Sequence, residues 1–259
     1  MTGEDERLAP WLAPWLAAPG RAGVLTDFDG TLSPIVDDPE AAQPLPGAVD
    51  LLARLAARYR TVAVVSGRPV AYLLDRLGPL PGVTMVGLYG LEKREGGAIE
   101  VLPEVRRWRE TVDAVAAASE TAAPAGIYVE RKGLAVGLHY RQAPEAASWV
   151  LAWAVDQAGR TGLVVHHGKM SLELVPPVPT DKGLVVAALA EGLDAACYVG
   201  DDVGDLPAFA ALADLRNQGV ATLAVAVRSG EEPPELVEQA DLVVDGAEGA
   251  MAFLRRLAR

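Results

Sequence analysis

The chain reads Val24-Leu25-Thr26-Asp27-Phe28-Asp29-Gly30-Thr31-Leu32, an apolar run that ends in two carboxylates separated by one residue and followed at once by Gly-Thr. At average residue usage this Asp-x-Asp-Gly-Thr pattern arises by chance on the order of once in 10^5 start positions. The apolar run predicts a buried strand, and ligands of open α/β sheets bind at the carboxyl ends of such strands. We therefore expect Asp27 and Asp29 to face one pocket at the edge of a parallel sheet.

The residues of this stretch suit phosphoryl transfer. A carboxylate such as Asp27 can take up a phosphoryl group, and a second carboxyl group, that of Asp29, can protonate the leaving oxygen. Gly30 lets the backbone approach a ligand closely, and the hydroxyl group of Thr31 can donate to a phosphate oxygen. The carboxylate pair by itself also fits a strand followed by an acidic turn, so residues elsewhere in the chain must decide between the two interpretations.

The composition indicates a globular, acidic protein. The chain has 259 residues, of which 51% are hydrophobic, and a formal net charge of -12. This charge argues against nucleic-acid binding, which needs clustered lysine and arginine. The single cysteine, Cys197, excludes an intramolecular disulfide and fits a reducing compartment. Residues 1–7 lack the apolar core of a signal peptide, and no apolar run approaches the roughly 20 residues that span a bilayer, so we expect a cytoplasmic protein without membrane contact.

The alternation of apolar runs with helical patterns predicts an α/β fold with a doubly wound parallel sheet. A helical pattern begins at Pro46, and a closing helix is expected from about 248 to 257. The apolar runs expected to form the parallel strands lie at 24–26, 61–65, 83–86, 195–199, 222–227 and 242–244.

The middle of the chain has a different pattern, typical of an inserted α+β domain. Helices are expected at about 103–118 and 144–158, and strands of alternating polarity at 126–130, 134–141, 163–166 and 171–175. Paired strands of this kind favour an antiparallel sheet that carries helices on one face. We therefore predict a core formed by residues 1–97 and 179–259, with residues 98–178 as a cap domain.

More polar residues stand where strands end or a helix begins: Ser66, Lys182, Asp201, Asp202 and Asp205. The carboxyl ends of parallel strands lie side by side, so residues far apart in the chain can share one site. Each residue by itself also fits a turn, a solvated helix position or a helix cap. Their order along the chain, each at an expected boundary, favours a phosphatase site over these alternatives.

This set supplies what phosphoryl transfer needs. The transferred group carries negative charge that a cation and hydrogen-bond donors must stabilise. Mg²⁺ prefers hard oxygen ligands, which Asp27, Asp201 and Asp205 can provide. Lys182 would neutralise phosphate and reduce repulsion between phosphate and Asp27, while Ser66 and Thr31 would donate from their hydroxyl groups.

Four motifs, Asp27-Phe28-Asp29-Gly30-Thr31, Ser66-Gly67-Arg68, Lys182 and Gly200-Asp201-Asp202, resemble in order those of the haloacid dehalogenase superfamily. The resemblance covers nearly the whole chain and implies a Rossmann-like core. It also implies Asp27 as a nucleophile that becomes an aspartyl phosphate and Asp29 as general acid and then base for water. Phosphate would be bound by Thr31, Ser66, Gly67 and Lys182, and Mg²⁺ by Asp27, the backbone carbonyl group of Asp29, Asp201 and Asp205.

Substrate choice is expected to reside in the cap. Polar side chains alternate along its predicted strands, and side chains two apart share a face that can hydrogen-bond sugar hydroxyl groups. Spacing alone favours a solvent-exposed sheet surface over a binding face. However, five segments are similar to those of trehalose-6-phosphate phosphatases: residues 27–35, the turn Gly90-Leu91-Glu92, Leu138-His139-Tyr140-Arg141, Gly168-Lys169 with Glu173, and Asp181-Lys182-Gly183. This resemblance implies a sugar site formed by Glu130, Lys132, Lys169 and Glu173, with Arg68 and Glu92 at the rim of the core.

The chain departs from the pattern of that family at two places. Gly204 and Leu206 stand where the family commonly has Thr and Glu, and Leu88-Tyr89 stands where Ser-His commonly precedes a glycine. Four functions stay open: Mg²⁺-dependent hydrolysis of trehalose 6-phosphate, hydrolysis of another phosphorylated disaccharide or glycosylated acid, non-catalytic sensing of a sugar phosphate, and transfer of the phosphoryl group to a second sugar, as in a sugar phosphomutase.

A short duplication, Ala-Pro-Trp-Leu at 9–12 and again at 13–16, is the one local repeat. We expect a helix that packs both tryptophans on the core, and an amphipathic docking segment for a trehalose-phosphate synthase is the alternative. Otherwise we expect a monomer whose partner is a small sugar phosphate.

Overall fold

The structure is a computed structural model that describes residues 3–36, 38–168, 170–230 and 232–259. Within them, eight strands form the larger sheet in the order β12-β11-β10-β1-β2-β3-β4-β5. The six parallel strands are β12 (Leu242–Asp245), β11 (Ala221–Arg228), β10 (Ala195–Gly200), β1 (Ala22–Thr26), β2 (Thr61–Val65) and β3 (Val83–Gly87). β1 pairs with β10 on one side and β2 on the other, and the predicted α/β fold with a parallel sheet is confirmed.

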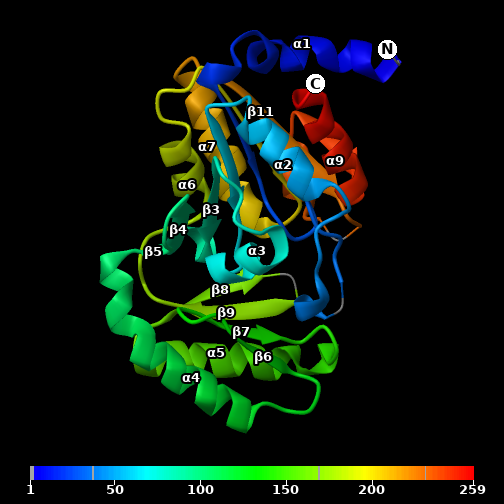
Figure 1. The fold of residues 1–259 in the computed structure, drawn as a ribbon. Helices are drawn as coiled ribbons and strands as arrows, with labels where there is room; N and C mark the ends of the chain where they lie inside the picture. The colour runs from blue at the N-terminus through cyan, green and yellow to red at the C-terminus, as the bar shows by residue number, and fades with distance from the viewer. Residues whose placement is uncertain (1–2, 37, 169, 231) are drawn as a thin grey trace.

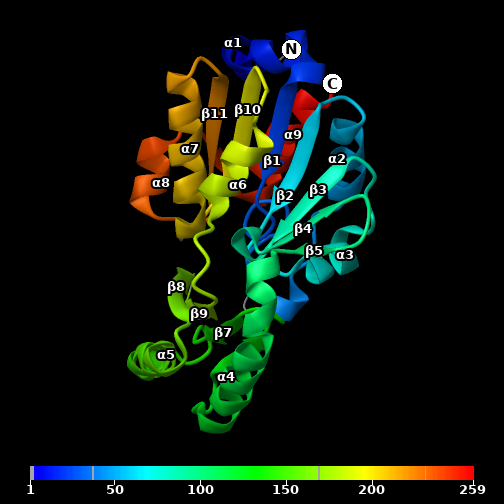
Figure 2. The same ribbon diagram turned by 90° about the vertical axis from the view of Figure 1, so that its left-hand side faces the viewer.

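Helices cover both faces of this sheet, as Figure 2 shows from the side. One face carries α2 (Ala48–Ala56), α3 (Val70–Leu77) and α9 (Gly246–Leu257). The other face carries α6 (Lys182–Leu189), α7 (Leu206–Asn217) and α8 (Pro234–Gln239). Short 3-10 helices span Pro19–Arg21, Pro39–Ala41, Leu88–Gly90, Pro103–Trp108, Pro144–Ala146 and Val203–Asp205.

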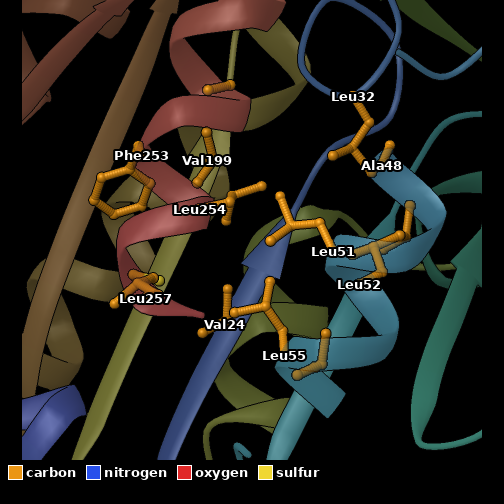
Figure 3. Packing of buried hydrophobic residues seen from close by; sticks show 14 of the residues in the cluster. Val24, Leu32, Ala48, Leu51, Leu52, Leu55, Val199, Phe253, Leu254 and Leu257 are labelled. Atoms are coloured by element: carbon orange, nitrogen blue, oxygen red, sulfur yellow. The ribbon is translucent and has the colours of Figure 1, made fainter. Parts of the chain in front are cut away.

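The parallel strands are apolar on both sides because both faces are covered. On the face of α2 and α9, the side chains of Leu51 and Leu55 meet Leu254 over Val24 of β1 (Figure 3). Each of these residues is at most 1% exposed. Burial of a leucine side chain stabilises a fold by about 1.5–3 kcal/mol, so this layer holds β1 firmly in the middle of the sheet.

Helix α1 (Gly3–Ala17) crosses the amino-terminal end of the sheet (Figure 1). Leu8, Leu12 and Trp15 form its buried stripe, and the indole N–H of Trp15 donates to the carbonyl oxygen of Gly23 at 2.9 Å. Trp11 is 48% exposed, so the expectation that both tryptophans of the repeat pack on the core is wrong. Trp11 lies at the border of the stripe, because successive helix positions rotate around the axis and bring residue 11 to the edge of the face that Leu8, Leu12 and Trp15 share.

An edge hairpin extends the sheet beyond the predicted strands. β4 (Glu92–Glu95) pairs antiparallel with β3, and β5 (Glu100–Val101) pairs antiparallel with β4. The sequence of β4 is Glu-Lys-Arg-Glu, without an apolar residue, and therefore gives no strand signal. β5 pairs with only Glu92 and Lys93 of β4, so Arg94 and Glu95 stay at the edge of the sheet, where charged side chains discourage pairing with other chains.

The cap contains a four-stranded antiparallel sheet in the order β6-β7-β9-β8 within the described residues. Its strands are β6 (Tyr128–Arg131), β7 (Val136–His139), β9 (Ser171–Val175) and β8 (Val164–Gly168). Helices α4 (Arg109–Ala122) and α5 (Ala147–Thr161) cover the face turned away from the core (Figure 1). The chain leaves the core after β5 and returns to the core at α6. The domain boundaries at 97 and 178 stay a prediction.

Among the described residues, no helix combines the length and the apolar character that crossing a bilayer requires.

Candidate active site

Three neighbouring parallel strands end in buried polar residues. Asp27 directly follows β1, Ser66 follows β2, and Asp201 follows β10. The backbone N–H of Asp27 donates to the carbonyl oxygen of Val199 at 2.8 Å, which continues the ladder beyond β1. The exposed fractions of Asp27, Ser66 and Asp201 are 4%, 1% and 2%. The carboxyl edge of the sheet thus gathers these polar groups, as expected for an open α/β sheet.

The turn after Asp27 is wound around the carbonyl group of Phe28, which accepts from three of the backbone N–H groups that follow. The Phe28 ring is fully buried, while Asp27 and Asp29 on either side of it both line one pocket. Gly30 has a φ of 72°, and a Cβ there would lie 2.1 Å from a carboxylate oxygen of Asp201. Glycine therefore meets two needs at this position: left-handed backbone and close approach to the neighbouring strand end.

Lys182 brings a positive charge to the strand ends. It is the first residue of α6, and the side chain of Asp181 caps that helix by accepting from the backbone N–H of Leu184 at 2.8 Å. The Lys182 Nζ lies 3.1 Å from Asp27 Oδ2 and 2.7 Å from Asp205 Oδ1. Burial alone would lower the pKa of Lys182, but Asp205 and Asp27 hold this pKa well above its ordinary value. Lys182 is therefore charged at neutral pH.

Asp27 is in a different electrostatic balance. Burial raises its pKa well above the ordinary value, while Lys182 acts in the opposite direction. Repulsion from Asp205, Asp202 and Asp201 adds to the effect of burial. A site with four clustered carboxylates and one lysine is short of positive charge, which a bound cation would supply.

Asp205 organises this loop. Its Oδ1 accepts from Lys182 Nζ at 2.7 Å and from the hydroxyl group of Tyr198 at 2.6 Å. Its Oδ2 accepts from the backbone N–H groups of Asp201 at 2.9 Å and of Asp202 at 3.1 Å. The side chain is fully buried. With four hydrogen bonds in place, Asp205 fixes the positions of Lys182 and Asp201.

Carboxylates at this edge fit a divalent cation. Asp27, Asp201 and Asp205 each offer an oxygen atom, and these atoms lie within 4.8 Å of one another. Hard oxygen ligands of this kind suit Mg²⁺. Because Asp205 is engaged in four hydrogen bonds, we expect Asp27 and Asp201 to provide the closer ligands.

Arg68 connects the core to the cap. Its Nε donates to Asp29 Oδ2 at 2.9 Å and its Nη2 to Asp29 Oδ1 at 3.1 Å, which is the bidentate geometry of a strong pair. Its Nη1 donates to Oε1 of Glu130, on β6, at 3.2 Å. The guanidinium group also lies over the Tyr72 ring, 4.5 Å from its centroid. Arg68 thus holds a carboxylate of the core and one of the cap at the same time.

On the cap side, charged groups form a buried network. Lys132 Nζ lies 2.6 Å from Glu173 Oε1 and 3.5 Å from Glu130 Oε2, and His139 Nε2 lies 2.8 Å from Glu130 Oε2. Burial alone would raise the pKa of Glu130, but Lys132, His139 and Arg68 prevail and lower it to about 2. Lys132 Nζ also donates to the carbonyl oxygen of Gly67 at 3.4 Å, so the cap sheet is closed onto the core.

One pocket is lined by both sets of residues. Its lining includes Asp27, Asp29 and Lys182 from the core together with Lys132 and Glu173 from the cap. Glu173 Oε2 in the pocket lining and Thr31 Oγ1 in the turn after Asp29 are buried side-chain oxygens without a hydrogen-bond partner in the described part of the chain. Buried oxygens of this kind are suited to a polar ligand, because leaving them unpaired is unfavourable.

Comparison with known proteins identifies the group to which this site belongs. The sequence profile of one family, described as trehalose-phosphatase, matches residues 25–236, a span that includes the strand ends, the cap and Lys182. The chain belongs to the trehalose-phosphatase family.

Relatives in this family are similar over most of the chain. A trehalose-phosphate phosphatase of Mycobacterium avium is 36% identical over 261 residues, which are 93% of this chain and 64% of that protein. One of Mycolicibacterium paratuberculosis is 37% identical over 265 residues, with the same coverage of 93% and 64%. This chain therefore spans somewhat less than two thirds of the length of these curated relatives.

Solved structures of the trehalose-phosphatase family share the fold. A trehalose-6-phosphate phosphatase related protein has a TM-score of 0.77 at 25% identity, covering 91% of this chain and 96% of that one. The C-terminal domain of a Candida albicans trehalose-6-phosphate phosphatase has a TM-score of 0.79 at 24% identity, covering 96% and 95%. A phosphatase of the haloalkanoate superfamily from Bacteroides thetaiotaomicron, with a TM-score of 0.55 at 18% identity and coverage of 91% and 94%, has the same fold.

Most candidate residues of this trehalose-phosphatase family member come together. Those lining the pocket or bonded to residues that line it are Asp27, Asp29, Ser66, Gly67, Arg68, Glu130, Lys132, Glu173, Lys182, Asp201 and Asp205. Thr31 is fully buried two residues after Asp29 and is not part of the pocket lining. Glu92 is apart: its carboxylate accepts from the backbone N–H of Val70 at 2.8 Å, at the start of α3. Lys169 lies outside the described residues.

The sequence patterns did not reveal two tyrosines of the site. Tyr198 looks like one more apolar residue of a buried strand, yet its hydroxyl group bonds Asp205. Tyr89 belongs to Leu88-Tyr89, which was noted only as a departure from the family pattern, and its side chain lines the pocket. A polar atom within a buried strand was the available signal for Tyr198, because such an atom needs a partner.

Proposed function

We propose that this chain is a phosphoric monoester hydrolase that converts trehalose 6-phosphate to trehalose and phosphate. The observation that supports the proposal most strongly is one pocket with two faces. Asp27, Asp29 and Lys182 of the core lie opposite the buried cap network of Lys132 and Glu173. The first group suits a phosphate ester, and the second suits the hydroxyl groups of a sugar.

Asp27 is proposed as the nucleophile. Its oxygen attacks phosphorus, the bond from phosphorus to the sugar oxygen breaks, and Asp29 delivers a proton to that oxygen. In the second half of the reaction Asp29 takes a proton from water, which attacks the aspartyl phosphate and regenerates Asp27. Release from the bidentate pair with Arg68 frees Asp29 for these proton transfers.

The phosphate group would be held by the strand ends. Lys182 supplies positive charge, and the hydroxyl groups of Ser66 and Thr31 and the backbone at Gly67 supply hydrogen bonds. The unpartnered Thr31 Oγ1 favours this role. We propose Mg²⁺ as the cofactor, bound by Asp27, Asp201 and the backbone carbonyl group of Asp29, with Asp205 in support. Its positive charge would stabilise the negative charge of the phosphoryl group.

The sugar would be recognised by Glu130, Lys132, Glu173 and Lys169, while Arg68 links Asp29 to the cap. Glu92 is better assigned to the start of α3, because its carboxylate bonds the backbone there. We further propose that the protein acts as a monomer in the cytoplasm. The exposed Trp11 favours α1 as the surface on which a trehalose-phosphate synthase would dock.

The test is phosphate release from a panel of sugar phosphates in the presence of Mg²⁺. We expect trehalose 6-phosphate to be among the best substrates and Asp27→Asn to abolish turnover nearly completely, because the amide is a poor nucleophile. Asp50→Asn makes the same chemical change at an exposed position of α2 and should leave the rate unchanged. Retained activity in Asp27→Asn would refute the chemistry, and a preference for another ester would refute the substrate.

A further inference from the structure

Tyr89 is held in an uncommon backbone conformation at the junction of core and cap. Leu88 and Tyr89 have φ values of 50° and 57°, a left-handed region that costs an L-residue about 1–2 kcal/mol. Hydrogen bonds compensate: the backbone N–H of Tyr89 donates to Ser66 O at 3.2 Å, and Tyr89 O accepts from the hydroxyl group of Thr180 at 2.8 Å. The loop that follows β2 and the segment before α6 thus determine where the tyrosine ring points.

The ring fills a space that two glycines leave open. A Cβ at Gly67 would lie 2.6 Å from the Tyr89 hydroxyl oxygen, while a Cβ at Gly204 would lie 3.1 Å from Asp202 Oδ1 and 3.4 Å from ring atom Cε1 of Tyr89, which is ordinary contact distance. Neither Gly67 nor Gly204 has a positive φ, so their backbone conformations do not require glycine. At Gly67, space for the ring is the physical reason that remains, whereas at Gly204 a Cβ would first crowd the Asp202 carboxylate and would already touch the ring, so only a longer side chain would press on the ring. The ring also meets His166 of β8 edge-on, with centroids 5.8 Å apart, so it contacts the cap as well.

Two departures from the family pattern are thereby connected. The chain has tyrosine at 89 where histidine is common, and glycine at 204 where threonine is common. The two positions are neighbours, since a Cβ at 204 would reach contact distance of the ring, and the changes in volume have opposite signs. A larger ring is matched by a smaller neighbour, which keeps the packing density of the pocket wall.

The tyrosine hydroxyl group stands between the two faces of the pocket. It lies over Gly67, whose carbonyl oxygen accepts from Lys132, the partner of Glu173. Burial, together with the negative charges of Glu173 and Asp202, raises the pKa of Tyr89 well above its ordinary value. The phenol is therefore neutral and can donate a hydrogen bond into the pocket.

We propose that Tyr89 is a specificity-determining residue that hydrogen-bonds the sugar ring next to the phosphate ester, and that Gly67 and Gly204 provide the space it requires. This inference rests on the proposed function. It separates the roles of the pocket: Lys182 and Ser66 bind any phosphate, whereas Tyr89 favours an ester whose alcohol is a sugar. Loss of the hydroxyl group then lowers the affinity for the sugar phosphate and leaves the affinity for inorganic phosphate unchanged.

Calorimetric titration in the Asp27→Asn background tests this without turnover, with trehalose 6-phosphate and inorganic phosphate as probes. Tyr89→Phe should lower the affinity for trehalose 6-phosphate about five-fold, which is the effect of one neutral hydrogen bond, and should change the affinity for inorganic phosphate by no more than about two-fold. Tyr59→Phe is the matched control and should change neither affinity, because the Tyr59 hydroxyl group donates to the carbonyl oxygen of Leu257 and neither residue lines the pocket. Equal weakening of both probes, or no weakening of either, would overturn the role of Tyr89.

The glycine is tested by Gly204→Thr, whose new atoms would press on the ring. We expect this variant to lower the affinity for trehalose 6-phosphate at least as much as Tyr89→Phe does. Tyr89→His combined with Gly204→Thr should recover part of that loss, since the smaller ring relieves the crowding. Losses that simply add would overturn the pairing of Tyr89 with Gly204.

The outcomes distinguish this inference from the proposed function. If trehalose 6-phosphate binds and Tyr89→Phe weakens it selectively, but the wild-type chain does not hydrolyse it, only the proposed function fails. If the wild-type chain hydrolyses it and Tyr89→Phe binds it normally, only the role of Tyr89 fails. If inorganic phosphate binds and trehalose 6-phosphate does not, both fail.

Discussion

Replacing Lys182 with methionine removes the cation that two buried carboxylates share. The side chains of Lys182, Asp27 and Asp205 are 2%, 5% and 0% exposed, and Nζ lies 3.1 Å and 2.7 Å from the two carboxylates. Breaking a buried pair by removing one partner destabilises a protein by about 3–5 kcal/mol, because a buried charge is left uncompensated. We expect Lys182→Met to lower the free energy of unfolding by that amount.

The assay is urea unfolding at pH 7 in the presence of a chelator, so that no divalent cation replaces the lost charge. Lys93→Met is the matched control, because Lys93 pairs with Glu95 at 2.9 Å while the side chains are 45% and 71% exposed. An exposed pair contributes about 0–1 kcal/mol. Adding Asp205→Asn to Lys182→Met should recover part of the loss, since it removes one of the stranded charges.

The effect should also depend on pH. Burial raises the pKa of Asp27 above its ordinary 3.8, and without Lys182 this pKa would rise further. A carboxyl group whose pKa is raised by folding stabilises the fold while it is protonated, and that stabilisation is lost as the pH rises through its folded pKa. The destabilisation by Lys182→Met should therefore be smaller at pH 5 than at pH 8. A loss no larger than that of Lys93→Met, or one independent of pH, would refute this reasoning.

Two further predictions concern Glu130 and Gly30. Folding lowers the pKa of Glu130 from 4.5 to about 2, so its contribution of about 3 kcal/mol is present above pH 4.5 and is lost as the pH falls toward 2. The gap in unfolding free energy between wild type and Glu130→Gln should shrink over that window, and a constant gap would contradict the assigned pKa. Gly30→Ala places a Cβ 2.1 Å from Asp201 Oδ2 and should reduce the rate of phosphate release at least about ten-fold. Gly47 has a similar positive φ, but a Cβ there meets no atom within 4 Å, so Gly47→Ala should lower only the free energy of unfolding, by about 1–2 kcal/mol. Comparable activity in the two glycine variants would show that the Gly30 contact is not needed.

Much of the fold was predictable because its signals are local. The strands of the core are continuous apolar runs, and a run that is buried on both faces needs no partner to be recognised. The edge hairpin of β4 and β5 was not predictable, since β4 consists of charged residues alone and is a strand only through its pairing with β3. The exposure of Trp11 was likewise decided by where α1 meets the sheet, which the repeat itself does not encode.

The residues of the candidate site likewise fall into those that a local pattern predicts and those that depend on tertiary contacts. Asp27 and Asp29 were predictable because their chemistry and their place after a strand appear within nine residues of sequence. Glu92 resembles a family position, but its carboxylate caps α3, and only the position of the Val70 N–H reveals this. Tyr89 was not predictable as part of the pocket, since its aim depends on hydrogen bonds to Ser66 and Thr180, which are far away in the chain.

By itself the sequence determined the parallel core, the pair of aspartates at its edge and the family, because short-range patterns of apolar and acidic residues carry that information. The tertiary structure decided which charges are paired and which residues are held apart from the pocket. Lys182 between Asp27 and Asp205, Arg68 between Asp29 and Glu130, and Tyr89 over Gly67 all depend on loops from different strands meeting at one edge. Distances between such loops follow from the packing of the whole sheet, and no local pattern specifies them.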